Sequence, residues 1–344
     1  MDFILNYALF FFKIFTLFAL ILTIFLIIVN VARHKSKKKY ELDIVSLNSY
    51  YEHVKNKIIL STMSTYEKKI WNKSNKLFKK TRSKINMTFL KKNKYYLNQN
   101  NPILYVLDFK GNVSASEVTS LREEISAIIL AAKENDEVLL RLESGGGVIH
   151  GYGLASSQLS RLREKNIRLT VSVDKIAASG GYMMACVANY IIAAPFSVIG
   201  SIGVVAQIPN FNKLLKKNNI DMELHTSGLY KRTLTVFGEN TKEAREKFCK
   251  DLNFTHVLFK EFVHSMRPSL NIDEVSTGEH WFGTTALEKK LIDKIETSDD
   301  FIISRIHKFS VLKIKYSVNK TMLDSFLLKI ENYVKNVVFK IFET

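Results

Sequence analysis

Short apolar runs alternate with helix-length amphipathic stretches between residues 103 and 173, and this order constrains the fold more than any other feature of the chain. The apolar runs cover residues 103–109, 138–142 and 167–173, and the helical patterns cover residues 116–133 and 152–165. Strands that alternate with helices form parallel βαβ units with right-handed crossovers. We therefore predict an α/β domain with a mostly parallel sheet and an active site at the carboxyl ends of its strands.

The third apolar run leads into a turn of small residues around Ser179, with Gly180 and Gly181 directly after it and an apolar segment beyond. Two glycines let the backbone turn sharply, and a helix start directs free N–H groups and its positive dipole end to the same point. Such a corner exposes a hydroxyl in surroundings that suit a nucleophile. Serine is also a preferred N-cap, and N-caps outnumber nucleophilic serines, so this stretch alone favours a capping role for Ser179.

Three consecutive glycines, residues 145–147, follow the strand predicted at 138–142. Their backbone N–H groups can point at a developing oxyanion, which is the largest electrostatic contribution expected in acyl transfer. A glycine loop can instead form a plain tight turn or bind phosphate. Neither the GxGxxG nor the GxxxxGK[ST] pattern is present, which disfavours nucleotide binding.

An activated serine needs a base, and the eight histidines lie in unrelated contexts without a persuasive His/Asp pair. Lys231 is the better candidate. A lysine acts as a general base only when desolvation lowers its pKa towards neutrality, because an ammonium group has no free lone pair. The apolar neighbours available to form a dry wall around it are Leu229, Tyr230, Leu234 and Val236. Most lysines are solvated, so composition alone does not single out Lys231.

Shorter elements are expected beyond Ser179. The apolar stretch 183–206 could be mistaken for a membrane span, but Pro195, Gly200 and Gly203 divide it into a core helix and short strands, since a span needs about 20 uninterrupted apolar residues. The remaining predicted elements are a helix at 211–218, a strand at 221–226, a long amphipathic helix at 241–266 capped by Thr241, a turn and helix within 278–293, and a strand at 291–296.

Residues 3–31 are almost wholly apolar and long enough to cross a bilayer as one helix. Positive charge follows this run and no small-residue cleavage site comes after it, so we predict a retained transmembrane anchor, residues 1–32, and not a cleaved signal peptide. Residues 33–101 lack a core pattern and are interpreted as a basic, partly helical linker. Of the 17 excess positive charges, 14 lie between residues 33 and 94, where they favour membrane topology or lipid contact over nucleic acid binding.

The predicted α/β domain spans residues 102–310, and residues 311–344 add a strand and an amphipathic helix for packing, partner contact or the membrane surface. Two cysteines, Cys186 and Cys249, have no CxxC or Cys/His neighbour with metal-ligand spacing. We expect both to be small core residues.

Four motifs in order resemble those of the signal peptide peptidase A family of serine/lysine peptidases. They are residues 141–147 (RLESGGG), 178–182 (ASGGY), 200–204 (GSIGV) and 230–233 (YKRT), and residues 278–283 (GEHWFG) add to them. The resemblance implies a ClpP/crotonase-like α/β fold without metal or organic cofactor. It also implies that Ser179 is the nucleophile, Lys231 the general base and later the acid, and Ser201 the residue that orients the lysine amine. By the same resemblance, the backbone N–H groups of Gly147 and Gly180 form the oxyanion hole.

The resemblance further implies peptide or unfolded-protein substrates and a homo-oligomer, because members of the family form rings whose neighbouring subunits line the substrate cleft. It suggests an inner-membrane protein with a periplasmic protease domain, whereas the basic residues after the anchor favour the cytoplasm. One position departs from the family pattern: Gly145 stands where the loop usually has proline, which loosens the loop by roughly several tenths of a kcal/mol.

Three functions stay open at this point. The first is a membrane-anchored serine endopeptidase with a Ser179/Lys231 dyad and an acyl-enzyme intermediate, acting in protein or peptide quality control. The second is a crotonase-like enzyme acting on an acyl thioester, for which Glu143 is the available acid/base carboxylate. The third is a non-catalytic scaffold derived from a peptidase, which the glycine at position 145 makes conceivable.

Overall fold

The computed structural model describes residues 10–20, 22–23, 40–74, 101–228 and 230–318. The chain divides into a main body, residues 42–316, and a second unit made of residues 1–41 and 317–344. In the second unit residues 10–20 and 22–23 are helical. Within the described residues no helix is long and apolar enough to cross a bilayer. Most of the predicted anchor, residues 1–32, and all of the tail helix beyond residue 318 lie outside the described residues, so both stay predictions.

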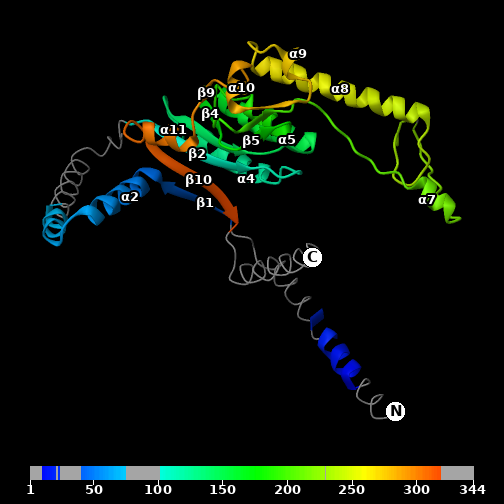
Figure 1. Ribbon diagram of the computed structural model, residues 1–344, viewed down its shortest axis with the longest axis horizontal. Helices are drawn as coiled ribbons and strands as arrows, with labels where there is room; N and C mark the ends of the chain where they lie inside the picture. The colour runs from blue at the N-terminus through cyan, green and yellow to red at the C-terminus, as the bar shows by residue number, and fades with distance from the viewer. Residues whose placement is uncertain (1–9, 21, 24–39, 75–100, 229, 319–344) are drawn as a thin grey trace. The chain divides into compact units, whose positions relative to one another are not determined.

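A seven-stranded sheet forms the centre of the main body, in the order β1-β10-β2-β3-β4-β6-β9 (Figure 1). Its strands are β1 (Tyr40–Ser46), β2 (Ile103–Lys110), β3 (Glu137–Glu143), β4 (Arg168–Val173), β6 (Tyr190–Ala193), β9 (Lys294–Ile295) and β10 (Ser310–Val318). From β10 to β9 all neighbouring strands pair in parallel. The predicted parallel α/β sheet is therefore confirmed, and the strands expected at 103–109, 138–142 and 167–173 match β2, β3 and β4 to within one residue at each end.

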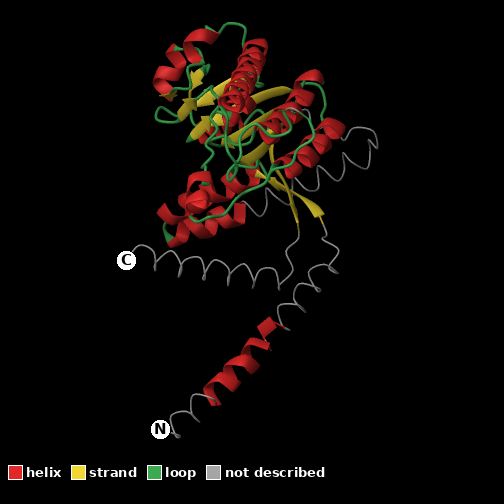
Figure 2. Ribbon diagram, turned by 90° about the vertical axis from the view of Figure 1, so that its right-hand side faces the viewer, coloured by secondary structure: helices red, strands yellow, loops and turns green. Residues whose placement is uncertain are grey.

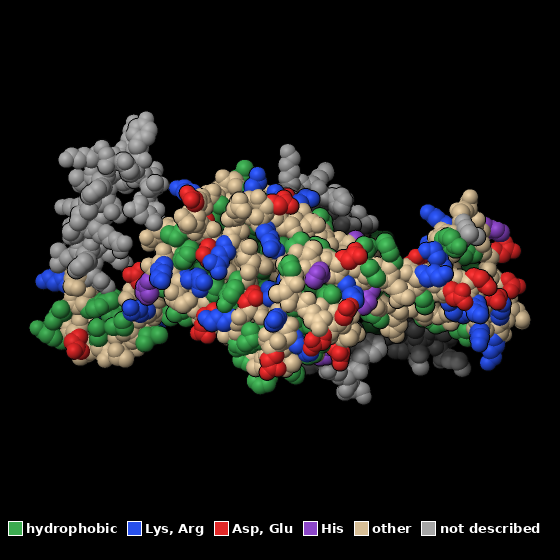
Figure 3. All heavy atoms as spheres, turned by 90° about the horizontal axis from the view of Figure 1, so that it is seen from above, with side chains coloured by type: hydrophobic (Ala, Val, Ile, Leu, Met, Phe, Trp, Pro, Cys, Tyr) green, Lys and Arg blue, Asp and Glu red, His purple; other side chains and the backbone are tan. Residues whose placement is uncertain are grey.

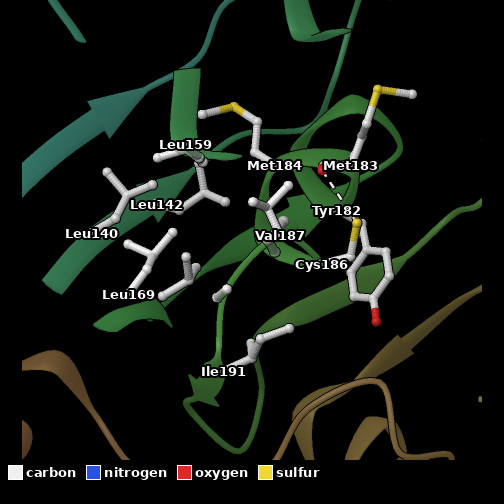
Figure 4. Close-up of a cluster of buried hydrophobic side chains, with 14 of the residues drawn as sticks. Leu140, Leu142, Leu159, Leu169, Tyr182, Met183, Met184, Cys186, Val187 and Ile191 are labelled. Carbon is white, nitrogen blue, oxygen red and sulfur yellow. Dashed lines mark hydrogen bonds between the residues drawn. The ribbon is translucent and has the colours of Figure 1, made fainter. Parts of the chain in front are cut away.

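Helices cover both faces of the sheet (Figure 2). Because side chains alternate along a strand, Leu107 and Leu140 point to one face while Val106 and Leu139 point to the other. The first face is covered by α4 (Val118–Ala131), α5 (Ile149–Glu164), α6 (Gly180–Ala185) and α8 (Lys242–Met266), and the second by α2 (Leu47–Thr62) and α11 (Ser298–Arg305). Figure 4 shows Met184 and Val187, from α6 and the turn after it, packed among the leucines of the first face. α6 is thus a fully buried helix.

A second sheet of three short strands carries the corner at Ser179. It consists of β5 (Ile176–Ala178), β7 (Val198–Gly200) and β8 (His280–Phe282), in that order. β5 and β7 run parallel, and β8 runs antiparallel to β7. α9 (Ile272–Val275) precedes β8 and α10 (Gly283–Glu288) follows it. The predicted division of residues 183–206 into core pieces is confirmed, since this stretch holds the end of α6, β6 and β7.

Residues 40–62 fall inside the stretch expected to be a linker, yet they add β1 and α2 to the sheet and its second face. The Asn48 side-chain amide donates to the carbonyls of Ile306 and Phe309 at 2.9 and 3.0 Å, and its oxygen accepts from the N–H of Val311 at 2.7 Å. The partners of this segment therefore lie about 260 residues further along the chain. No local pattern indicates contacts at that separation.

Two smaller predictions are wrong. Residues 221–226 form no strand, because they lie on an exposed excursion, residues 204–240, that we call the arm. Cys249 is exposed on α8, while Cys186 is buried as expected and burial raises the pKa of its thiol to about 12. The long helix itself is confirmed as α8, and the hydroxyl of Thr241 caps it by accepting from the N–H of Ala244 at 3.2 Å.

Candidate active site

Ser179 lies where β5 ends and α6 begins. Its N–H donates to the carbonyl of Gly200 at 2.8 Å, and its carbonyl accepts from the N–H of Met183 at 3.0 Å. These bonds hold the corner from the second sheet on one side and from α6 on the other. Ser179 is half-buried, so its hydroxyl is within reach of a substrate.

The backbone at Ser179 is strained, with φ at 52° and ψ at −119°. A positive φ is uncommon for a residue with a Cβ, and such conformations cost about 1–3 kcal/mol. Ser179 occupies the N-cap position of α6, but its hydroxyl makes no capping hydrogen bond. The capping role that the local sequence favoured is therefore wrong. Strain of this kind persists only where the surroundings fix it, and it concentrates at functional sites.

The glycine loop lies directly against this corner. Gly146 has a φ of +87°, and a Cβ there would stand 2.8 Å from Ala178 O, Gly180 N and Ser179 Cβ. Only glycine permits both that conformation and that approach. Among the described residues, the N–H groups of Gly147 and Gly180 donate to no acceptor. The structure thus brings the loop that carries one free donor into contact with the helix start that carries another.

Ser201 follows β7 in the same way that Ser179 follows β5. Because Ala178 is in register with Gly200, the two serines are neighbours at the ends of paired strands. Ser201 also has a positive φ, 52°, and its N–H donates to the carbonyl of Glu279 at 2.6 Å. The structure therefore brings Ser179, Ser201 and the glycine loop together.

The arm carries Lys231 and folds mainly on itself around α7 (Asn212–Lys217). The N–H of Phe211 donates to the carbonyl of Val236 at 2.7 Å, and Lys216 pairs with Glu239 at 3.0 Å. Figure 1 shows α7 below the end of α8 that is far from the sheet, with extended segments of the arm between them, and Figure 3 shows charged and hydrophobic side chains mixed over this region.

Lys231 is exposed, and its neighbour Tyr230 is 60% exposed. Leu229 lies outside the described residues. Within the described residues the Lys231 side chain is thus exposed and not enclosed by an apolar wall, and no hydrogen bond joins Lys231 to Ser179.

Two side chains that the sequence did not single out stand behind the glycine loop. The hydroxyls of Ser144 and Tyr152 lie 2.6 Å apart, and both residues are buried. They come from the end of β3 and the first turn of α5. The two residues are eight positions apart, separated by a loop, and no periodic pattern indicates a contact at that separation. The one hint in the sequence was that Ser144 directly precedes the three glycines.

Glu143, the carboxylate considered for thioester chemistry, lies on the other face of β3. Side chains alternate along β3, so Glu143 points to the same face as Leu139 and Arg141. Its carboxylate oxygens pair with Lys110 and Lys175, each at 3.4 Å. These charged side chains line a cavity of about 290 Å³ on that face. Glu143 therefore does not face Ser179. Over the ranges that the structure describes, no group of three or more His, Cys, Asp or Glu side chains could hold a metal ion.

Comparison with known families matches nearly the whole chain to one of them. The model of the peptidase family S49 N-terminal region matches residues 2–159, and that of peptidase family S49 matches residues 161–310. The chain belongs to peptidase family S49. This match confirms the resemblance seen in the four motifs. As a member of family S49, the chain is a peptidase.

Relatives within family S49 match over almost their full length. Two chains named as SohB proteases are 56% and 57% identical to this one over 342 residues, from Buchnera aphidicola subsp. Baizongia pistaciae and subsp. Acyrthosiphon pisum. Each match covers 99% of this chain and 98% of the relative. Among solved structures, a mutant of the 1510-N membrane-bound stomatin-specific protease in complex with a substrate peptide gives a TM-score of 0.41 at 13% identity, over 67% of this chain and 99% of that chain.

Proposed function

We propose that this family S49 peptidase is a membrane-anchored serine endopeptidase that cleaves peptide bonds in unfolded proteins or peptides through Ser179 and Lys231, in protein quality control. One observation supports this most strongly. Ser179 is held in a strained conformation with a hydroxyl that caps no helix, against a loop and a helix start whose N–H groups have no acceptor among the described residues. That arrangement suits attack on a carbonyl and stabilisation of the oxyanion.

In the proposed reaction, Ser179 Oγ attacks the scissile carbonyl carbon while its proton passes to the Lys231 amine. The N–H groups of Gly147 and Gly180 hold the oxyanion, and the Ser201 hydroxyl orients the amine. The resulting ammonium then protonates the leaving amine, the peptide C–N bond breaks, and an acyl ester remains on Ser179. Lys231 next takes a proton from water and the hydroxide attacks the ester carbonyl. The bond between the acyl carbon and Ser179 Oγ then breaks, the carboxylic acid product leaves, and the Lys231 ammonium returns its proton to Ser179 Oγ. No metal or organic cofactor takes part.

This reaction requires Lys231 to be neutral, and therefore to lie in drier surroundings than the exposed arm provides. The arm exposes several large apolar side chains, namely Val205, Leu214, Ile220, Met222 and Leu224. An interface with another part of the assembly would cover these side chains. We propose a homo-oligomer in which the arm, of the same chain or of a neighbouring copy, brings Lys231 to Ser179.

Three substitutions test the dyad in the purified full-length chain. We expect Ser179→Ala and Lys231→Ala to abolish hydrolysis of an unfolded fluorogenic protein, and Lys231→Arg to fail as well because arginine keeps the charge but does not release its proton. Ser157→Ala and Arg232→Ala are matched controls, since both residues are exposed and have no role in the reaction. Hydrolysis at the wild-type rate by Ser179→Ala or Lys231→Ala would remove the proposal.

Co-expression of the Ser179→Ala and Lys231→Ala chains tests the source of the lysine. Activity recovered in the mixed oligomer assigns Lys231 to a neighbouring copy, and no recovery assigns it to the same chain. A chain that stays monomeric at all working concentrations and is still active contradicts the proposed assembly.

The exposure of Lys231 favours one second candidate, a non-catalytic scaffold. Labelling of Ser179 by a fluorophosphonate separates the two, because only an activated hydroxyl reacts. The thioester alternative is disfavoured by the position of Glu143, and saturable binding of coenzyme A would reinstate it.

The proposed location is the inner membrane, with residues 1–32 as the anchor. The composition after the anchor and the family pattern favour opposite sides of the membrane for the protease domain. Digestion of right-side-out membrane vesicles with an added protease decides between them, since only a periplasmic domain is cleaved before lysis.

A further inference from the structure

Ser144 makes hydrogen bonds to β5, to the glycine loop and to Tyr152, next to the nucleophile corner. Its N–H donates to the carbonyl of Ile176 at 2.8 Å, and its carbonyl accepts from the N–H of Ala178 at 3.0 Å. These two bonds fix β5, which ends one residue before Ser179. Its hydroxyl oxygen accepts from the N–H of Gly146 at 3.1 Å. One buried serine therefore ties the glycine loop to the strand that delivers Ser179.

Tyr152 continues this connection. Its hydroxyl lies 2.6 Å from Ser144 Oγ and donates to the carbonyl of Asn112 at 2.7 Å. A hydroxyl has a single proton, so the Tyr152 proton is committed to Asn112 and Ser144 must be the donor in the bond between the two hydroxyls. The result is a one-way chain from Gly146 N–H through Ser144 and Tyr152 to the carbonyl of Asn112. Burial raises the pKa of Tyr152, which keeps this proton in place at neutral pH.

The ring of Tyr152 also touches the other oxyanion donor. A Cβ on Gly180 would stand 2.5 Å from Tyr152 Cγ, and a Cβ on Gly111 would stand 2.4 Å from both Tyr152 Oη and Ser144 Oγ. The aromatic ring therefore packs directly on Gly180, and the hydroxyl at its far end is enclosed by the turn after β2. One side chain contacts the helix start that carries one free N–H and, through Ser144, the loop that carries the other.

The residue between Ser144 and Gly146 does not supply this order itself. Gly145 is exposed, its backbone is outside the left-handed region, and a Cβ there would meet only Ile176 Cδ1, at 3.8 Å. Its N–H makes no hydrogen bond among the described residues. Glycine is the residue with the most backbone freedom, so the conformation of the loop must be fixed from its flanks.

From these contacts we propose that Tyr152 and Ser144 are positioning residues, which hold the N–H groups of Gly147 and Gly180 in one fixed arrangement around the oxyanion. This inference rests on the proposed peptidase function, since it concerns the same site. Neither side chain touches the substrate. Their effect is on where the two donors point when the tetrahedral intermediate forms.

The informative substitution is Tyr152→Phe, which keeps the ring on Gly180 and removes only the hydroxyl. Ser144 then loses its acceptor, and the loop loses the anchor that reaches Asn112. Loss of a complete oxyanion donor lowers kcat by about 100- to 1000-fold, and here both donors remain but are less well ordered. We therefore expect kcat to fall by roughly 10- to 100-fold with KM changed by less than about twofold, because ground-state binding does not use the oxyanion contacts.

A purely structural role for Tyr152 would not produce that pattern. The affinity of a peptide boronate, whose tetrahedral adduct on Ser179 places an oxygen in the oxyanion hole, should weaken by the same factor as kcat. Tyr105→Phe is the matched control, because Tyr105 is also a buried tyrosine, its hydroxyl donates to Asp136 at 3.3 Å, and it lies near the opposite end of β2. We expect this control to keep wild-type kcat and boronate affinity even if its melting temperature falls.

Ser144→Ala provides a second, independent variant, which removes the acceptor of the Gly146 N–H and leaves the tyrosine in place. If Tyr152→Phe does not fold, Ser144→Ala carries the test with the same expected loss. A kcat within twofold of wild type in a folded variant overturns the inference, as does an equal loss in Tyr105→Phe. Ser179→Ala in the same assay separates the two proposals: if it is active the peptidase proposal fails, and if it is inactive while Tyr152→Phe and Ser144→Ala are normal, only the positioning role fails.

Discussion

Replacement of Ser179 by glycine is expected to stabilise the protein while ending its activity. The observed φ of 52° and ψ of −119° cost a residue with a Cβ about 1–3 kcal/mol, and glycine adopts such conformations freely. Glycine also loses more conformational freedom on folding than serine does, and this cost offsets about 0.5–1 kcal/mol of the relieved strain. The net expectation for Ser179→Gly is a free energy of unfolding about 1 kcal/mol higher than that of the wild type.

Ser179→Ala is the proper reference for this measurement, because alanine also removes the hydroxyl but keeps the Cβ and hence the strain. The Ser179 hydroxyl caps no helix, so the alanine variant should differ from wild type by only a few tenths of a kcal/mol, about the range of an uncoupled substitution. The difference in free energy of unfolding between the glycine and alanine variants therefore measures the effect of the backbone conformation at position 179 alone. For a domain of this size 1 kcal/mol corresponds to about 2–4 °C in Tm.

The assay is thermal and urea-induced unfolding of the full-length variants in one detergent, with both variants confirmed as inactive. Ser157, exposed in the middle of α5, serves as the control position: there glycine should be less stable than alanine by about 1 kcal/mol, as in any helix interior. The free energy of unfolding of the glycine variant minus that of the alanine variant should therefore be positive at position 179 and negative at position 157. If Ser179→Gly unfolds at or below the temperature of Ser179→Ala, the corner is not strained and the main support for a nucleophile there is lost.

Three other predictions concern the loop and the core. Gly145→Ala should raise the free energy of unfolding by about 0.4–1 kcal/mol and leave kcat within twofold, because its Cβ meets only one side-chain atom at 3.8 Å; a loss of stability in urea unfolding would contradict this. Gly146→Ala should lower stability by about 1–3 kcal/mol and block fluorophosphonate labelling, since its φ is +87° and its Cβ would press on the nucleophile corner; labelling at the wild-type rate would count against the loop contact. Burial raises the pKa of Glu124 to about 7, so the folded state holds a proton that the unfolded state releases, and stability should fall by about 3 kcal/mol as pH rises from about 4.5 to 7. Glu124→Gln should flatten that slope, and an unchanged slope would assign it to other groups.

The sequence predicted the centre of the fold well, because the relevant patterns are local. β2, β3 and β4 and the helices between them each have a hydrophobic period that fits within one element. β1 was missed, and α2 was expected only as part of a partly helical linker and not as part of the domain, for the opposite reason. Their stabilising contacts, such as those of Asn48, join residues about 260 positions apart, and a polar side chain that caps distant carbonyls leaves no period in the sequence.

The arm shows a different limit of sequence reasoning. The strand expected at 221–226 has suitable residues, but the described part of the chain offers no neighbouring strand to pair with, and strand formation depends on such pairing more than on intrinsic preference. The same stretch exposes apolar side chains on a single chain. The local composition therefore predicted a strand at 221–226, but the described residues provide no paired strand and no buried surface for it.

The two halves of the candidate site differ in how the sequence encodes them. Around Ser179 the requirement is steric: a Cβ on Gly146, Gly180 or Gly181 would stand only 2.8, 2.5 or 2.4 Å from its nearest neighbour. Only glycine satisfies such a requirement, so it appears in the sequence as a fixed motif. The requirement on Lys231 is electrostatic, because an amine becomes a base through the dryness of its surroundings, and many different side chains can supply that. A motif can therefore identify which lysine to consider, but it does not encode the surroundings that would make that lysine a base, and the described residues leave Lys231 exposed.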